Sequence, residues 1–175
     1  MDQENLHELL QIRRQKLEQL KEKGIDPYAP KYRADHYSKD IIERFESLEG
    51  KEVSIAGRLV SIRAHGKATF AHLQDYKGRI QIYLRFDQLA EEKYSLFNLC
   101  DLGDFIGCRG TVFRTRKGEV TVNVTDYRFL VKSLRPLPEK WHGLKDVELR
   151  YRQRYLDLIV TDSVRQTFIN RSKIV

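Results

Sequence analysis

The sequence has few cysteines and no long apolar run. None of its apolar stretches approaches the roughly 20 residues that a membrane-spanning helix needs, so we expect a protein that does not enter a membrane. Its two cysteines, Cys100 and Cys108, have a spacing that matches no zinc or redox motif, and buried, reduced thiols are expected. The opening residues MDQENLHELL lack the basic start and small-residue cleavage site of a presequence. These absences predict a cytoplasmic protein.

The charge is distributed unevenly along the 175 residues, whose net charge is +7. Residues 1–50 carry 9 basic and 11 acidic side chains, whereas residues 51–135 carry 15 basic and 9 acidic ones, a local charge of +6. Residues 136–175 carry 8 basic and 5 acidic side chains. A basic middle segment favours a polyanionic partner, although many proteins are modestly basic.

Residues 1–50 read as a helical leader and linker. Leucines at helical spacing predict one amphipathic helix that ends at Gly24. Pro27 and Pro30 then predict an extended linker that lies on the following domain. A short helix is expected over residues 39–48, capped by Ser38.

Residues 51–135 change to the alternating pattern of β-strands. We predict strands over residues 52–63, 67–75, 79–86, 104–115 and 119–132, and a helix over 89–100. Gly57 is expected to cause a bulge or sharp coil in the first strand. Five strands with a helix between the third and fourth predict a Greek-key barrel of the OB type. The fold class is therefore mainly β with flanking helices, preceded by the amphipathic N-terminal helix.

Residues 136–175 are expected to begin another domain. The segment Leu134-Arg135-Pro136-Leu137-Pro138 predicts a rigid hinge. Asp146 can cap a helix that runs through Leu158, and Thr161 or Asp162 can cap another. No glycine, asparagine or proline closes this last helix, so we expect either a chain cut off before its next domain begins or a frayed natural terminus.

The second and third strands offer a binding face, because OB barrels bind ligands across it. Alternation places Thr69, Ala71 and Leu73 inside, and it leaves Phe70 and His72 outside. On the third strand Ile80, Ile82 and Leu84 point inward, and the outward set is Arg79, Gln81, Tyr83 and Arg85. Such a surface suits unstacked nucleotides, since rings stack on bases, amides bond base edges and cations hold phosphates.

Each of these residues also has a plainer explanation. The N-terminal helix could cover Phe70, and Gln81 and the arginines could be solvated strand residues. In the turn from Arg114 to Glu119, a carboxylate among cations indicates either base reading or an ordinary hairpin charge pair. Asp101 and Asp104 flank a strand and are expected to be turn residues.

Four stretches of the chain resemble the N-terminal part of a bacterial-type class II lysyl-tRNA synthetase. They are LEQLKEKGIDPYAP, VSIAGRLVSIRAHGKATFAHLQDYKGRIQIYLR, RPLPEKWHGLKDVELRYRQRYLDL and FINRSKIV. The resemblance implies that the barrel binds a tRNA anticodon loop. It implies that Phe70 stacks on the central base, that Gln81 hydrogen-bonds this base and that Glu119 contacts the same region. It also implies that Arg63 holds anticodon nucleotides or phosphate. The supporting basic and aromatic face would comprise His72, Tyr83, Arg79, Lys67 and Arg116.

The resemblance also implies an activity that these residues do not carry themselves. The full enzyme would ligate lysine to its tRNA with ATP and Mg²⁺ through a lysyl-adenylate, and it would form a homodimer through its catalytic domain and motif 1. The ATP-site motifs are absent here, so we expect no catalytic residue, no metal site and no bound cofactor in residues 1–175. Two alternatives are a free-standing OB module that binds single-stranded RNA or DNA, and a regulatory or interaction paralogue without catalysis.

Overall fold

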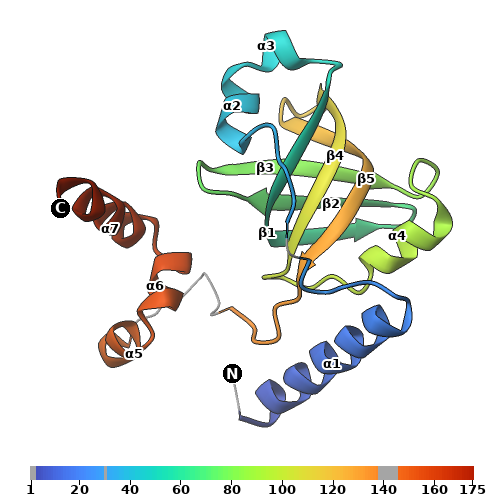
Figure 1. Cartoon of the computed structure of the whole chain (residues 1–175). Coiled ribbons are helices and arrows are strands. Elements are labelled where there is room, and N and C mark those ends of the chain that lie inside the picture. The colour runs from blue at the N-terminus through green and yellow to red at the C-terminus, as the bar shows by residue number, and fades with distance from the viewer. Residues whose placement is uncertain (1–2, 30, 138–145) are drawn as a thin grey trace. The chain divides into compact units, whose positions relative to one another are not determined.

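The computed structural model describes residues 3–29, 31–137 and 146–175 and divides the chain into two units. The first unit is Met1–Pro136 and the second is Leu137–Val175 (Figure 1). Pro30 lies outside the described residues, as does Pro138 at the end of the predicted hinge. Within the described ranges, no helix has the length and apolar character needed to cross a membrane.

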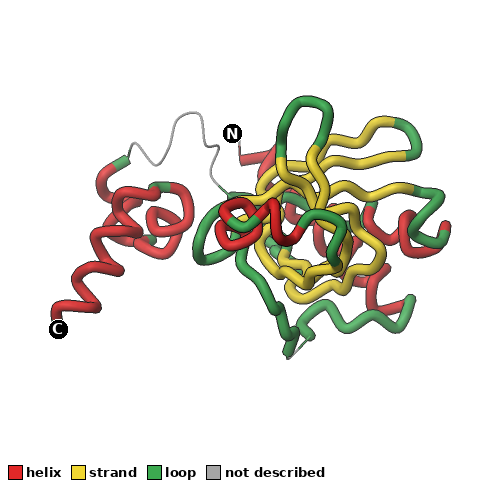
Figure 2. Tube along the Cα trace, turned by 90° about the horizontal axis from the view of Figure 1, so that it is seen from above, coloured by secondary structure: helices red, strands yellow, loops and turns green. Residues whose placement is uncertain are grey.

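The first unit is built on a closed five-stranded barrel. Its strands are β1 (Glu52–His65), β2 (Ala68–Gln74), β3 (Arg79–Arg85), β4 (Phe105–Arg114) and β5 (Val120–Val131). The order around the barrel is β1-β2-β3-β5-β4, and β1 closes it by pairing antiparallel with both β2 and β4. Only β3 and β5 are parallel neighbours among these pairs. Viewed from above, the strands form a ring (Figure 2). The predicted fold class is confirmed.

The barrel interior holds the alternate residues that the sequence pattern predicted. Thr69, Ala71 and Leu73 of β2 are buried, as are Ile80, Ile82 and Leu84 of β3 and Val122 and Val124 of β5. The helix between β3 and β4 is α4 (Glu91–Phe97), shorter than predicted at both ends, and its Phe97 joins the same core. Burial of these apolar side chains stabilises the fold by about 25 cal/mol for each Å² removed from water.

The sequence predicted a bulge or sharp coil of β1 at Gly57, and this prediction was wrong in position. The register with β2 shifts between Leu59 and Ser61 instead. Gly57 has a different role, because a Cβ atom at this position would lie 2.7 Å from the backbone oxygen of Gln74. The glycine is therefore needed for close contact between two strands, and the bulge that follows it changes which β1 side chains face outward.

The leader helix α1 (Gln3–Glu22) ends at Gly24, whose φ of 70° is the predicted left-handed stop. Its apolar stripe is only partly used. Leu17 and Leu20 are buried, whereas Leu6 and Leu9 are each 37% exposed. The C-terminal half of α1 is thus the part that is anchored in the first unit.

The predicted helix over residues 39–48 is two short helices, α2 (Ser38–Glu43) and α3 (Phe45–Leu48). Ser38 does not cap them. It is the first residue of α2, and Tyr37 takes the N-cap position; the Ser38 N–H and hydroxyl both donate to the carboxylate of Asp75, the hydroxyl at 2.8 Å. Arg44 separates the two helices, and Gly50 follows with a φ of 73°.

A buried ionic network fastens α1 and the end of β5 to the barrel. The ammonium of Lys132 has no exposed side-chain surface and lies 2.6 Å from Asp101 and 2.7 Å from Asp104. Lys16 of α1 lies 2.6 Å from the other oxygen of Asp101. Arg13 donates to the carbonyl oxygens of Leu102, Ser133 and Arg135. Asp101 and Asp104 bracket a turn as expected, with the Asp104 N–H donating to the Asp101 carbonyl at 3.1 Å, and their carboxylates are also members of this charge cluster.

The second unit contains three short helices, α5 (Val147–Arg152), α6 (Arg154–Val160) and α7 (Asp162–Ile174). Asp146 caps α5 as predicted, since it accepts from the N–H of Leu149 at 3.2 Å. The expected single helix through Leu158 is interrupted at Gln153. Thr161 occupies the N-cap position of α7, but its hydroxyl donates to Asp157 at 2.8 Å and does not cap the helix.

Candidate nucleic-acid interface

Two rows of side chains cross the outside of the barrel on β1, β2, β3 and β5. Within each row, the strand register places residues of adjacent strands opposite one another. We call the first the aromatic row: Arg63, Phe70, Tyr83 and Asn123. We call the second the polar row: Ser61, His72, Gln81 and Thr121. The predicted pairings of Phe70 with Tyr83 and of His72 with Gln81 are confirmed.

The aromatic row presents a stacked pair of rings. The ring centroids of Phe70 and Tyr83 are 4.4 Å apart, and the planes differ by 21°. Phe113 of β4 adds a third ring at 6.2 Å from Tyr83. Phe70 and Tyr83 are half-buried, and Arg63, beside Phe70, is exposed. A stacked pair with an accessible face and a neighbouring guanidinium suits a base and its phosphate.

The polar row is a continuous chain of hydrogen bonds that includes one residue from the β4–β5 hairpin, Glu119. The hydroxyl of Ser61 lies 2.7 Å from His72 Nδ1, and His72 Nε2 lies 2.8 Å from Glu119 Oε1. Gln81 Nε2 donates to Glu119 Oε2 at 2.6 Å. Thr121 Oγ1 donates to Gln81 Oε1 at 2.9 Å. The carboxylate of Glu119 is thereby held at both oxygens.

The direction of each hydrogen bond follows from the carboxylate. An ionised carboxylate only accepts, so we assign a proton to His72 Nε2 and place the amide nitrogen of Gln81 toward Glu119. In a neutral imidazole the other nitrogen then accepts, and the Ser61 hydroxyl donates to it. Gln81 keeps a second N–H, and each oxygen of Glu119 keeps an acceptor position for a ligand.

Gln81 differs from the prediction in its environment. It lies on the outer side of β3 as expected, but it is only 6% exposed, because Glu119 and Thr121 cover it. It is therefore not an ordinary solvated strand residue. The amide is fixed in one orientation and has little freedom to lose when a base binds.

Glu119 occupies a position that its hairpin defines. The N–H of Thr115 donates to the Glu119 carbonyl at 3.0 Å, and the Glu119 N–H donates to the Thr115 hydroxyl at 3.1 Å. Gly118 turns the chain with a φ of 86°. Within the described residues, the Glu119 carboxylate contacts His72, and no ion pair joins it to the basic residues of its hairpin. Its side chain is 47% exposed, so the carboxylate remains accessible.

Three predicted supporting residues lie outside these contacts. Arg79 is exposed at the start of β3, opposite Gln74 and next to the polar row. The Lys67 ammonium lies 5.7 Å from the centre of the Phe86 ring, at the other end of the β2–β3 hairpin. Arg116 is exposed at the tip of the β4–β5 turn. Their positions suit phosphate contacts around the rows rather than contact with the same base.

Sequence reasoning missed three members of the rows. Ser61 was hidden by the shift in register after Leu59, which changes the phase of the β1 alternation. Thr121 and Asn123 reach the rows only through the parallel pairing of β5 with β3, between segments distant in sequence. Within the described residues, one buried side-chain polar atom lacks a hydrogen-bond partner, and it is the side-chain oxygen of Asn123.

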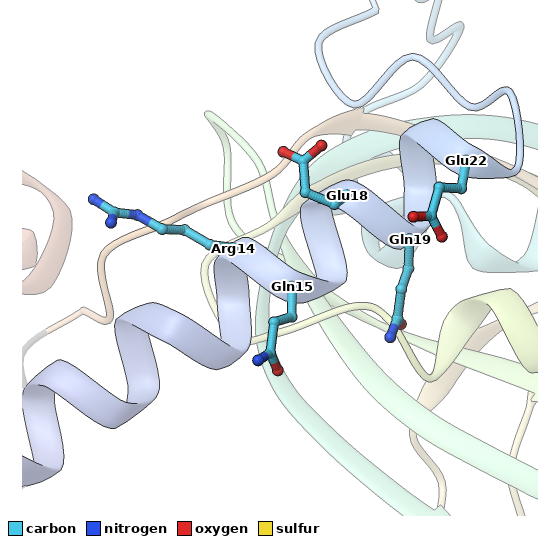
Figure 3. A pocket seen from close by; sticks show the side chains of 5 residues that line it. All are labelled: Arg14, Gln15, Glu18, Gln19 and Glu22. Carbon is cyan, nitrogen blue, oxygen red and sulfur yellow. The ribbon is translucent and has the colours of Figure 1, made fainter.

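Elsewhere the first unit has a shallow surface hollow of about 410 Å³ along α1. Its lining comes from one helix, Arg14, Gln15, Glu18, Gln19 and Glu22 (Figure 3). The side chains in Figure 3 spread in several directions and do not converge on one point. The described residues also contain no group of three His, Cys, Asp or Glu side chains placed to hold a metal ion. The two rows are therefore the best candidate interface.

Comparison with known proteins agrees with this geometry. Residues 53–130, which include both rows and Glu119, match the family of OB-fold nucleic acid binding domains of the tRNA anticodon type. The barrel belongs to that family. The whole chain is 55% identical, over 175 residues, to the lysine–tRNA ligase of Carboxydothermus hydrogenoformans. It is 56% identical over 169 residues, 97% of the chain, to that of Moorella thermoacetica, and 51% identical over 179 residues, 98% of the chain, to that of Bacillus subtilis.

These relatives confirm the resemblance to bacterial-type lysyl-tRNA synthetases that the sequence indicated. The chain covers their anticodon-binding OB domain. It spans 35% to 36% of the length of each of these three relatives. What it shares with them is therefore the barrel and its flanking helices.

Proposed function

We propose that this chain is the anticodon-binding portion of a class II lysine–tRNA ligase and that its two rows read one base of the anticodon loop. The observation that carries this proposal is the carboxylate of Glu119, held between His72 and Gln81 beside the Phe70–Tyr83 stack. Phe70 stacks on the base, while Gln81 and Glu119 bond its edge. The site residues are thus Phe70, Gln81, Glu119 and Arg63.

The hydrogen-bond pattern favours a particular class of base. Glu119 can only accept, and the second N–H of Gln81 can only donate. Uracil offers an N3–H donor next to a carbonyl acceptor, and guanine offers N1–H next to O6. Cytosine and adenine place an unprotonated ring nitrogen at the corresponding position, which a carboxylate repels. The pair therefore selects bases with an N–H on the Watson–Crick edge, and uridine is the base implied by the lysyl-tRNA synthetase family.

The basic residues around the rows bind the backbone of the loop. Arg63 lies in the aromatic row, and Arg79, Lys67 and Arg116 surround the two rows at greater distance. Residues 51–135 carry a net charge of +6, which raises affinity for RNA and makes binding weaken as salt increases. His72 and Tyr83 complete the face within the rows.

The remaining features of the enzyme are proposed from the relatives. Residues 1–50 form the leader, 51–135 the anticodon-binding domain and 136–175 the hinge and first part of a class II catalytic domain. ATP and Mg²⁺ would be bound by that catalytic domain in the full enzyme, and this segment would be inactive alone. The full enzyme would be a cytoplasmic homodimer formed through the catalytic domain and motif 1.

The test is a titration of the 175-residue chain with a tRNA(Lys) anticodon stem-loop, monitored by fluorescence anisotropy. We expect Phe70→Ala to weaken binding by about 1–3 kcal/mol, the usual contribution of one base stacked on an aromatic ring. Gln81→Ala should weaken it by about 1–3 kcal/mol through the lost base contact. Tyr28→Ala removes an exposed ring of the linker and is the matched control, which should bind normally.

Other results would identify a different function. Equal affinity for the cognate stem-loop and for a scrambled loop would favour a free-standing module that binds single strands without base preference. Dimerisation through residues 162–175 with no binding of any nucleic acid would favour an interaction paralogue. Normal binding by both Phe70→Ala and Gln81→Ala, with intact folding by circular dichroism, would refute the site.

A further inference from the structure

We propose that His72 is a positioning residue that fixes the carboxylate of Glu119 for base selection, and that Ser61 holds the His72 ring from its other nitrogen. This inference rests on the proposed function and adds a role for His72 and Ser61, which support the base-contacting residue Glu119 without contacting the base. His72 and Glu119 are 47 positions apart in the sequence, and the barrel brings them to 2.8 Å.

The carboxylate needs such support because of where it is attached. Glu119 has three rotatable side-chain bonds, and its side chain is 47% exposed on a hairpin. The same hairpin carries three cations, Arg114, Arg116 and Lys117, which would attract a free carboxylate. Gln81 holds only Oε2, so without His72 the group could rotate about that single hydrogen bond. The bond from His72 to Oε1 prevents this rotation and keeps the free acceptor positions beside the aromatic row.

Ser61 holds the side of the His72 ring that faces away from the carboxylate. Its hydroxyl lies 2.7 Å from Nδ1, and the geometry places Nε2 toward the carboxylate. With the proton on Nε2, the Ser61 hydroxyl donates to Nδ1 and the imidazole donates to Glu119. The His72 side chain is 20% exposed, so its ring is held between two partners and is largely shielded from competing water. Hydrogen-bonded support of this kind orients a contacting group more than it adds contacts of its own.

The experiment measures selectivity, which a purely structural role would not change. The affinities of the chain for two stem-loops, with uridine or cytidine at the central anticodon position, give a discrimination ratio. His72→Phe keeps a planar ring but removes the donor, and we expect the ratio to fall about tenfold because a hydrogen bond to a charged group is lost. The loss should lie in the uridine complex. Ser61→Ala should lower the ratio less, since the ring can still donate.

The conservative variant and a double variant complete the design. His72→Gln retains an N–H donor at similar reach and should restore most of the ratio. Glu119→Gln should lower the ratio alone, and His72→Phe should then have little further effect, because both changes act through the same carboxylate. Thermal unfolding of each variant by circular dichroism verifies that the barrel is folded.

Three results distinguish the possible failures. An unchanged ratio in His72→Phe, while Phe70→Ala still weakens binding, would overturn the positioning role and leave the proposed function intact. An equal loss for both stem-loops would also overturn it, since this indicates a general structural effect. If the wild-type chain binds both stem-loops equally and Phe70→Ala has no effect, the proposed function itself fails and the inference fails with it.

Discussion

Replacing Lys132 by methionine should destabilise the first unit by about 3–5 kcal/mol, the usual cost of removing one partner from a buried ion pair. The ammonium of Lys132 has no exposed surface and contacts two carboxylates, Asp101 at 2.6 Å and Asp104 at 2.7 Å. Without it, Asp104 is a fully buried carboxylate whose remaining bonds come from the backbone N–H groups of Asp101 and Ser133, each at 2.7 Å. Methionine keeps most of the packing of the lysine stem, so the loss reports the charge.

The expected loss is large in relation to the net free energy of unfolding of the domain. A domain of this kind has a net stability of about 5–15 kcal/mol, so the variant should lose a substantial part of it. Equilibrium urea unfolding monitored by far-ultraviolet circular dichroism measures the change at constant m-value. Lys21→Met is the matched control, because the exposed pair of Lys21 with Glu18 should contribute about 0–1 kcal/mol.

A double variant tests the mechanism directly. Adding Asp104→Asn to Lys132→Met removes the uncompensated buried charge, so the double variant should lose less than the sum of the two single variants. A loss below about 1 kcal/mol in Lys132→Met, or strict additivity in the double variant, would refute the reasoning, since buried and coupled charges cannot be so independent.

Three further predictions concern pH, packing and thiol chemistry. Burial opposes ionisation of Asp101, but hydrogen bonds from lysine ammonium groups outweigh burial and lower the pKa of this carboxyl group. The stability that Asp101 contributes is present above its unfolded-state pKa of about 3.9 and should be lost as the pH falls below that value. In an acid titration of unfolding free energy, the Asp101→Asn variant should not show this loss. Gly107→Ala should lower the melting temperature by several degrees, as its Cβ would lie 2.5 Å from the Tyr32 ring, and unchanged melting would contradict the close contact. Burial raises the pKa of the Cys100 and Cys108 thiols, so a thiol reagent should modify them only at the rate of unfolding, and rapid labelling of the native protein would show that they are accessible.

Much of the candidate site could be predicted because it lies on two adjacent antiparallel strands. A short turn fixes the register of β2 with β3, so alternation alone placed Phe70 beside Tyr83 and His72 beside Gln81. Ser61, Thr121 and the contacts of Glu119 could not be predicted in this way. They depend on a bulge in β1 and on the position of the β4–β5 hairpin, which lies about 40 residues further along the chain than β2 and β3.

The helices show the same limit of prediction from local sequence patterns. Local patterns located the leader helix and the cap of Asp146, because both depend on residues close in sequence. They did not show that α2 would begin at Ser38 itself, which leaves Tyr37 at the N-cap position, so the predicted cap did not form. They also gave no reason for the breaks at Arg44 and Gln153.

The sequence by itself determined the alternation of inward and outward residues, the five strands with their order along the chain, and the identity of the aromatic and basic residues on the binding face. Only the tertiary structure decided which of these residues support one another. Alternation and capping act between near neighbours, whereas the Glu119–His72 bond and the Lys132–Asp104 pair join residues 47 and 28 positions apart. Such contacts form only in the closed barrel, because bringing distant segments together costs chain entropy that the whole fold must offset.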